Sequence, residues 1–174
     1  MAKTILHFLL VLAFCHTIVA TENWKVNLSA KINGPTADEV WPYVADFCNL
    51  YKIYPSSVSF CDKGTEGRPG LFRYSITIAQ SPSTPNATVV AGWVREELVK
   101  ISVTKKYVAY EMHENTGGIT MLKASMQVVP SGNKGCTFKW NIEAAPIAGF
   151  TYKLFADSFE ASLTGMVALI QSLF

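Results

Sequence analysis

The end of the chain constrains the fold most strongly, because it carries a long apolar helical stripe that a second layer must cover. Residues 148–174 contain no proline and no cluster of turn residues. Large apolar side chains recur there at three- and four-residue spacing, as on one face of an α-helix. This face comprises Phe150, Leu154, Phe155, Phe159, Leu163, Met166, Val167, Ile170 and Leu173. Such a stripe is stable in water only when it packs against another element.

Strand-like segments supply that element. Alternating apolar and polar residues between turn residues predict strands at 24–32, 58–61, 71–79, 88–101, 107–114, 118–129 and 136–144. After the first strand, Thr36 and Glu39 form the capping box of a helix whose apolar residues continue to Cys48. This order predicts an α+β fold in which an antiparallel sheet curls and the last helix covers its concave face. Large side chains then hold helix and sheet apart, which leaves room for an apolar cavity.

The chain begins with the pattern of a secretory signal peptide. Lys3 precedes an apolar segment at residues 5–14, and residues 18–20 fit a cleavage site after Ala20. We therefore expect residues 1–20 to be removed and residues 21–174 to form one secreted domain, either extracellular or vacuolar. A retained membrane anchor is the alternative, although the apolar segment is too short to span a bilayer. No later segment is apolar enough to cross a membrane, so we expect no stable membrane association.

Charge and histidine content exclude several functional classes. The chain has 15 basic and 13 acidic residues, and only Lys3 among them lies in the expected signal peptide. A mature chain this close to neutral lacks the positive field of nucleic-acid-binding proteins. His113 is the one histidine after residue 20, on the polar side of its strand beside Glu111. A histidine-rich metal site is therefore excluded, and we expect a monomer without metal or cofactor.

Three cysteines follow the expected signal peptide, an odd number for a secreted protein. A disulfide between Cys48 and Cys61 is possible, but spacing does not establish whether their geometry permits it. We expect Cys136 to be a buried free thiol. Asn27 and Asn86 begin glycosylation sequons, and Asn86 is the better candidate because the preceding residues form a proline-rich loop.

Glu96 is the strongest candidate for a chemical role. It alternates in phase with Val94 and Leu98, whereas Arg95 and Glu97 occupy the opposite face of the same strand. A carboxylate on the apolar side of a strand is costly unless it has a partner or a task. The pattern leaves two interpretations open, a structural ion pair or a group that takes and returns a proton.

The same alternation predicts which side chains face the cavity and bind a small apolar metabolite. Besides Glu96, the strands contribute Val94, Leu98, Val108, Tyr110, Met112, Leu122, Ala124, Met126, Phe138 and Trp140. The last helix contributes Phe155, Phe159 and Met166. Most inward-facing residues of a small domain form ordinary core, so only part of this set is expected to touch a ligand.

Several motifs, taken in order and spacing, resemble a known family. They are Val40-Trp41, the run from Asp46 to Lys52, Pro55-Ser56, Phe72-Arg73-Tyr74, and residues 95–99, 124–129 and 138–140. They span nearly all of the mature chain. The sequence resembles the helix-grip fold of START lipid-transfer domains and the birch-pollen allergen group. Within that superfamily it is most similar to plant polyketide cyclase/dehydrase-like proteins of the lachrymatory factor synthase type.

The resemblance implies a reaction and the residues that carry it. In those synthases a pocket arginine and glutamate act together, and the matching positions here are Arg73 and Glu96. An aromatic pocket hydroxyl matches Tyr110. The implied chemistry relocates a proton in a small alkenyl sulfenic acid and gives a thial S-oxide. Arg73 would hold the substrate oxygen and Glu96 would move the proton, while Tyr110 would orient the oxygen or shuttle the proton.

The orientation of Arg73 is ambiguous from alternation. In its strand the more apolar face comprises Phe72, Tyr74, Ile76 and Ile78, which would turn Arg73 outward. A bulge near Gly70, or an apolar outer face covered by other groups, would reconcile the pattern with the resemblance.

Leu122 and Met166 depart from the family pattern, because the pocket of the onion lachrymatory factor synthase type has aromatic residues at the matching positions. The secretory signal is another departure. These differences imply a different, bulkier substrate and a different place in which the protein meets it.

Two functions of different kinds fit the sequence, a cofactor-independent isomerase or cyclase and a non-catalytic carrier or sensor of an apolar metabolite. The buried carboxylate favours catalysis, because it would only weaken the binding of an apolar ligand. A secreted defence protein that acts through its surface is a third possibility, but no exposed patch in the sequence indicates it.

Overall fold

The computed structural model describes residues 22–54, 57–84, 86–132 and 134–174. The predicted signal peptide therefore lies outside the described residues. The elements are β1 (Trp24–Ile32), α1 (Ala37–Ala45), the 3₁₀ helix η1 (Phe47–Lys52), β2 (Ser57–Lys63), β3 (Leu71–Gln80), β4 (Thr88–Ser102), β5 (Tyr107–Asn115), β6 (Leu122–Pro130), β7 (Cys136–Ala144) and α2 (Tyr152–Ser172).

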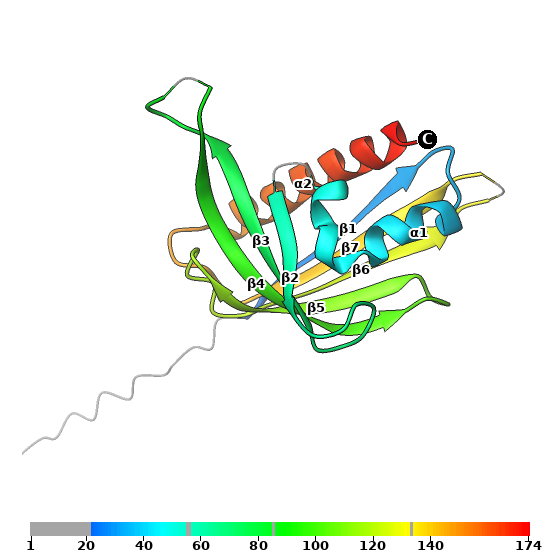
Figure 1. Ribbon diagram of the computed structural model, residues 1–174, viewed down its shortest axis with the longest axis horizontal. Coiled ribbons are helices and arrows are strands. Elements are labelled where there is room, and N and C mark those ends of the chain that lie inside the picture. The colour runs from blue at the N-terminus through cyan, green and yellow to red at the C-terminus, as the bar shows by residue number, and fades with distance from the viewer. Residues whose placement is uncertain (1–21, 55–56, 85, 133) are drawn as a thin grey trace, which may run out of the picture.

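The strands form one curved antiparallel sheet of seven strands in the order β1-β7-β6-β5-β4-β3-β2. The two helices and η1 lie on the same side of this sheet, and the long α2 crosses its concave face (Figure 1). The predicted α+β layout and the helix-grip fold implied by the resemblance are therefore confirmed.

Two predicted boundaries were wrong, and local hydrogen bonds explain both. The sixth strand begins at Leu122 instead of residue 118, because the Asn115 side chain holds the preceding turn. Its Oδ1 accepts from the amides of Gly117 and Ile119, each at 2.9 Å. The first helix ends at Ala45 instead of continuing to Cys48, and the chain turns into η1. The capping box that starts this helix is present as predicted.

The buried face of α2 is narrower than the sequence predicts. Its buried residues are Phe155, Leu163, Met166, Val167 and Ile170, and Phe159 is partly buried. Phe150, Leu154 and Leu173 belong to the predicted face but are exposed. Phe150 precedes the helix, and Leu154 points about 100° away from Phe155 around the helix axis.

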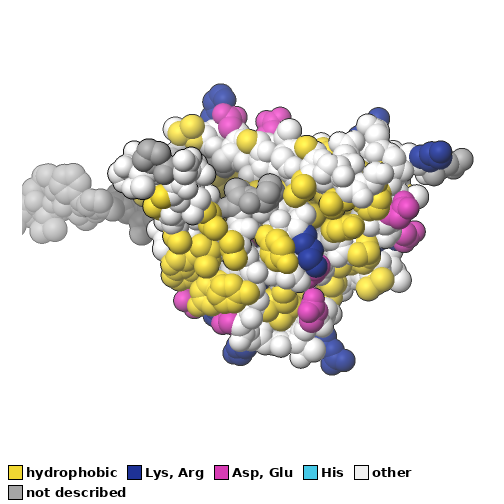
Figure 2. Space-filling view, turned by 45° about the horizontal axis from the view of Figure 1, so that its top comes forward, with side chains coloured by type: hydrophobic (Ala, Val, Ile, Leu, Met, Phe, Trp, Pro, Cys, Tyr) yellow, Lys and Arg dark blue, Asp and Glu magenta, His cyan; other side chains and the backbone are white. Residues whose placement is uncertain are grey.

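Apolar side chains also gather in patches on the face displayed in Figure 2, interrupted by charged ones. Neither described helix has the length and apolar character needed to cross a bilayer.

A disulfide bond fastens η1 to the edge of the sheet. Cys48 of η1 and Cys61 of β2 are bonded, with 5.1 Å between their Cα atoms. The Ser59 hydroxyl reinforces this contact, since it donates to the Cys48 carbonyl at 3.0 Å and accepts from the Tyr51 amide at 3.3 Å. Cys136 is free and buried, and burial raises the pKa of its thiol. The segment that carries Phe47 is therefore held in place by a covalent bond and by hydrogen bonds.

We expect the double substitution Cys48→Ala/Cys61→Ala to lower the free energy of unfolding. The bond closes a loop with a sequence separation of 13, and loops of that size gain about 3 kcal/mol from restriction of the unfolded chain. Urea denaturation with circular dichroism measures the loss. Cys136→Ala is the control for removal of a thiol without a bond. An unchanged denaturation midpoint in the double variant would contradict a stabilising bond.

Candidate active site

The orientation of Arg73 is decided by the outer face of the sheet. Arg73 is 3% exposed and points into the concave side. The apolar side chains that alternate with it cover one another on the outside: Tyr74 stacks on Phe60 with ring centres 5.6 Å apart, and the Arg95 guanidinium lies 4.2 Å from the centre of the Phe72 ring. Of the two explanations considered, the apolar outer face is therefore the one that holds. A bulge does lie close to Gly70, between Cys61 and Lys63 opposite Arg73 and Phe72, but its extra residue belongs to β2. The pairing of β3 with β4 is continuous from Leu71 to Thr77, so this bulge does not change the alternation of β3.

Arg73 and Glu96 form a buried ion pair between adjacent strands. They are direct partners in the register of β3 and β4, and Arg73 Nε donates to Glu96 Oε2 at 2.8 Å. Arg73 Nη1 donates to the carbonyl oxygen of Phe47 in η1 at 3.1 Å. The guanidinium also lies over the Phe47 ring, 4.0 Å from its centre, and 5.1 Å from the centre of the Tyr110 ring. Each charge thus has a partner, without which burial would be costly.

Part of the hydrogen-bonding capacity of this pair is unused. Within the described residues, Glu96 Oε1 and Arg73 Nη2 make no hydrogen bond, although both side chains line a cavity. A carboxylate oxygen and a guanidinium nitrogen are therefore available to a ligand at the same point. One accepts a proton or hydrogen bond and the other donates.

Tyr110 adds a neutral hydroxyl to the pair. Its side chain is 4% exposed, and its hydroxyl oxygen accepts from Trp140 Nε1 at 3.1 Å. Burial and, to a lesser extent, the negative charge of Glu96 raise the pKa of Tyr110 far above its ordinary value. The hydroxyl therefore keeps its proton at physiological pH and can donate it to an oxygen in the cavity.

The cavity lies between the concave face of the sheet, η1 and α2, and has a volume of about 330 Å³. Of the residues predicted for it, the structure places on its wall Arg73, Val94, Glu96, Tyr110, Met112, Leu122, Met126, Trp140, Phe155, Phe159 and Met166. They come from distant parts of the sequence, because the curved sheet and α2 bring their inner faces together.

Four residues predicted for the cavity are not on its wall. Leu98, Val108, Ala124 and Phe138 are between 0% and 6% exposed but belong to the packed core. The helix α1 packs against β5 and β6, and its buried residues Val40, Trp41 and Val44 fill that part of the concave face. Alternation identifies inward-facing residues but cannot show which of them a second element covers.

Sequence reasoning missed ten wall residues: Leu50, Tyr54, Ser57, Ser75, Thr77, Gly117, Ile119, Ile147, Phe150 and Ser158. Most of them lie in η1 or in loops, where no periodicity indicates direction. Ser75 and Thr77 could have been found from the sequence by taking the phase of Arg73 as inward, since they follow it at intervals of two residues.

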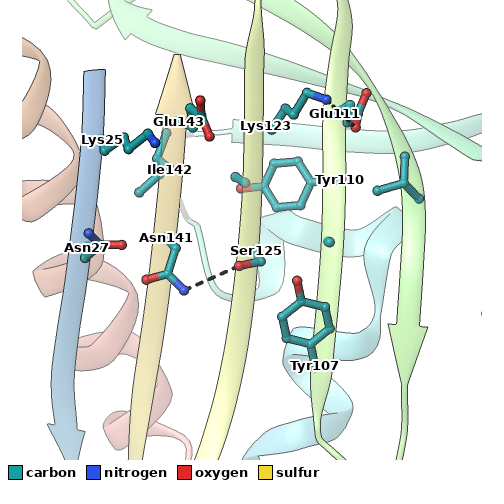
Figure 3. A pocket seen from close by; sticks show the side chains of 13 residues that line it. Lys25, Asn27, Tyr107, Tyr110, Glu111, Lys123, Ser125, Asn141, Ile142 and Glu143 are labelled. Carbon is teal, nitrogen blue, oxygen red and sulfur yellow. Dashed lines mark hydrogen bonds and ion pairs between the residues drawn. The ribbon is translucent and has the colours of Figure 1, made fainter. Parts of the chain in front are cut away.

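A second hollow lies on the opposite face of the sheet and has a different character. Figure 3 shows its polar side chains, among them the ion pair of Lys123 with Glu111 at 3.2 Å and the contact of Asn141 with Ser125. Asn27, one of the two sequon residues, is exposed there. The Lys123–Glu111 pair is accessible to solvent, with side chains 57% and 38% exposed, so this hollow lacks a buried ion pair such as that of the inner cavity.

His113 lies outside the cavity. Its Nε2 is 2.8 Å from Glu97 Oε2 on the outer face of the sheet. In the part of the chain that the structure describes, no group of three or more His, Cys, Asp or Glu residues could hold a metal ion.

Removing one member of the ion pair should destabilise the fold more than removing both charges. Glu96→Leu and Arg73→Met each leave an uncompensated buried charge, which costs about 3–5 kcal/mol. We expect the apolar double variant Arg73→Met/Glu96→Leu to lose much less than the sum of the single losses. A double-mutant cycle by urea denaturation measures this coupling. Additive losses would contradict a direct interaction.

The stability contributed by Tyr110 should depend on pH in the alkaline range. In the unfolded chain this tyrosine ionises near its ordinary pKa of 10.0, whereas in the folded protein its pKa is raised. Its contribution is therefore complete below pH 10 and falls as pH rises through the interval between the two values. Compared with Tyr110→Phe, the wild type should lose about 1 kcal/mol more between pH 9 and pH 11. A constant difference between the two proteins would show that Tyr110 ionises equally in both states.

Known proteins share both the sequence pattern and the fold. Residues 23–171 match a family described as polyketide cyclase/dehydrase and lipid transport. Ginseng major latex-like protein 151 from Panax ginseng superposes with a TM-score of 0.66 at 14% identity, over 87% of this chain and 97% of that one. Protein XoxI from Bacillus cereus gives 0.66 at 16% identity over 86% and 94%, and a protein from Thermobifida fusca gives 0.64 at 21% identity over 86% and 94%.

At these identities the solved structures show the fold alone, whereas the family match covers most of the chain. The chain therefore belongs to the polyketide cyclase/dehydrase and lipid-transport family, within the superfamily of START and birch-pollen-allergen-like helix-grip proteins.

Proposed function

We propose that the protein is a cofactor-independent isomerase or cyclase that moves a proton within a small, reactive, largely apolar substrate. The observation that carries this proposal is the ion pair of Arg73 and Glu96, buried on the wall of an otherwise mostly apolar cavity. Buried ionisable groups that retain unused hydrogen-bonding capacity are typical of catalytic sites.

Each residue of the site has a distinct chemical task in this proposal. The free Arg73 Nη2 holds the substrate oxygen and stabilises negative charge that develops on it. The free Glu96 Oε1 takes the acidic proton and returns it to a carbon further along the substrate. Tyr110 donates a hydrogen bond to the same oxygen. The proton that leaves one atom is added to another, so that the overall change is an isomerisation that consumes no co-reactant.

The resemblance to lachrymatory factor synthases supports an alkenyl sulfenic acid or a related oxygen acid as the substrate type. Leu122 and Met166 lie on the cavity wall, where the onion-type pocket has aromatic residues. Smaller or more flexible side chains leave space for a larger substrate. We therefore propose the same proton relocation on a bulkier molecule, with water kept out by the surrounding apolar wall.

Transport of an apolar ligand is the second candidate function. The observation that favours it is that Arg73 and Glu96 neutralise each other without a ligand. A cavity with no net charge can hold an apolar molecule without transforming it. The family description includes both activities, and the two functions differ only in whether the proton moves.

We also propose that the protein works outside the cytosol. The bond between Cys48 and Cys61 supports secretion, because disulfides persist in oxidising compartments. Asn27 and Asn86 are both exposed and stay predicted glycosylation sites.

Glu96→Gln should abolish turnover and leave ligand uptake intact. The amide keeps the shape of the side chain but cannot accept and return a proton, which should reduce the rate at least 100-fold. Purified protein is incubated with plant metabolite extracts, and mass spectrometry identifies compounds that are converted or retained. The matched control is Glu97→Gln on the outer face of the same strand, which should keep full activity.

Full activity of Glu96→Gln on an identified substrate would contradict the acid–base role. Retention of a compound by the wild type without any conversion would favour the transport function instead.

A further inference from the structure

Ser75 is a buried polar group that the proposed chemistry does not use. Among the described residues, its Oγ is the one side-chain nitrogen or oxygen atom that is itself fully shielded from solvent and has no hydrogen-bond partner. Ser75 is 7% exposed and lies on the cavity wall. A buried hydroxyl without a partner loses its hydrogen bonds to water and gains none in return, which costs about 1–3 kcal/mol. Such a group requires an explanation.

The neighbouring serines show that the fold can satisfy hydroxyls at this place. Ser57 donates to the carbonyl of Tyr54 at 3.1 Å, and Ser59 donates to the carbonyl of Cys48 at 3.0 Å. Ser59 is the direct partner of Ser75 in the register of β2 and β3. Both neighbours use the backbone of the segment around η1; Ser57 and Ser75 both line the cavity, and of these two only Ser75 Oγ lacks a partner within the described residues.

The spacing of residues along β3 gives the distance between Ser75 and the ion pair. Arg73, Ser75 and Thr77 follow one another at two-residue intervals on the inner face of β3 and all line the cavity. Each interval along a strand spans about 6.6–6.8 Å. Exposure rises in the same order, since Arg73 and Ser75 are buried and Thr77 is exposed. Ser75 therefore lies between Arg73, which is the most buried of the three residues, and Thr77, which is exposed at the cavity opening.

We propose that Ser75 is a specificity-determining residue that binds a second oxygen of the ligand, about 7 Å from the group held by Arg73 and Glu96. The ligand class is then an apolar molecule with two hydrogen-bonding groups, one at its inner end and one further toward the opening. Val94, the register partner of Ser75, and Met112, the register partner of Glu96, line the same cavity and contact the apolar body. The inference deepens the proposed function because it uses the same cavity, but it concerns binding and does not require turnover.

Because Ser75 Oγ has no hydrogen-bond partner among the described residues, its removal should not lower the stability of the fold. Ser75→Ala removes an unsatisfied hydroxyl, so the denaturation midpoint should stay the same or rise. A hydroxyl with a structural task would give the opposite result. Ser59→Ala is the matched control, because it removes a buried hydroxyl that has two backbone partners and should lower the midpoint.

The binding experiment compares two probes that differ by one hydroxyl, 2-naphthol and 2,6-dihydroxynaphthalene, by isothermal titration calorimetry. We expect Ser75→Ala to weaken the binding of 2,6-dihydroxynaphthalene about three- to tenfold and to leave that of 2-naphthol unchanged. In Ser59→Ala the ratio of the two affinities should equal that of the wild type.

Equal losses for both probes, or no loss for either, would overturn the assignment, as would a wild type that binds neither naphthalene. The result is independent of the catalytic proposal, since an inactive protein can still show the Ser75-dependent ratio. Conversely, loss of activity in Glu96→Gln together with an unchanged ratio in Ser75→Ala would retain the proton transfer and reject the second polar contact.

Discussion

The ion pair between Arg73 and Glu96 is the interaction on which the rest of the site depends. Two opposite charges lie on neighbouring strands inside the protein, 2.8 Å apart and almost without access to water. Neither could be buried alone, because the loss of hydration of a single charge exceeds what the surrounding apolar groups return. The pair therefore requires a fixed register between β3 and β4 and a fixed acceptor for Nη1 of the guanidinium.

Several features that are distant in the sequence meet these requirements. The disulfide between Cys48 and Cys61 holds η1 against β2, and η1 supplies the carbonyl and the ring of Phe47 to the guanidinium. Contacts between aromatic side chains on the outside of β3 stabilise the strand in the orientation that turns Arg73 inward. Tyr110 contributes a hydroxyl that burial keeps protonated. The result is a polar site on the wall of a mostly apolar cavity. Such a site can exchange a proton with a ligand or bind the ligand without changing it.

The sequence was sufficient to predict the fold because the patterns that indicate strands and helices are local and recur along the chain. Alternation located all seven strands, and the last strand agrees with the structure at both ends. The capping box located the start of α1. Periodicity predicted the C-terminal helix, although exposed Leu154 and Leu173 show that its buried stripe was drawn too wide. Where a side chain held a turn, as Asn115 does before β6, the prediction of the boundary failed.

By itself, the sequence determined the order of elements, the inward phase of Glu96 and, through resemblance, the pairing of Glu96 with Arg73. Only the tertiary structure decided that Arg73 points inward, because that depends on aromatic contacts between three strands on the outer face. It also decided which inward residues line the cavity and which, like Phe138, are covered in the core. The physical reason is that alternation reports the direction of a side chain along one strand, whereas its surroundings depend on packing between elements far apart in the chain.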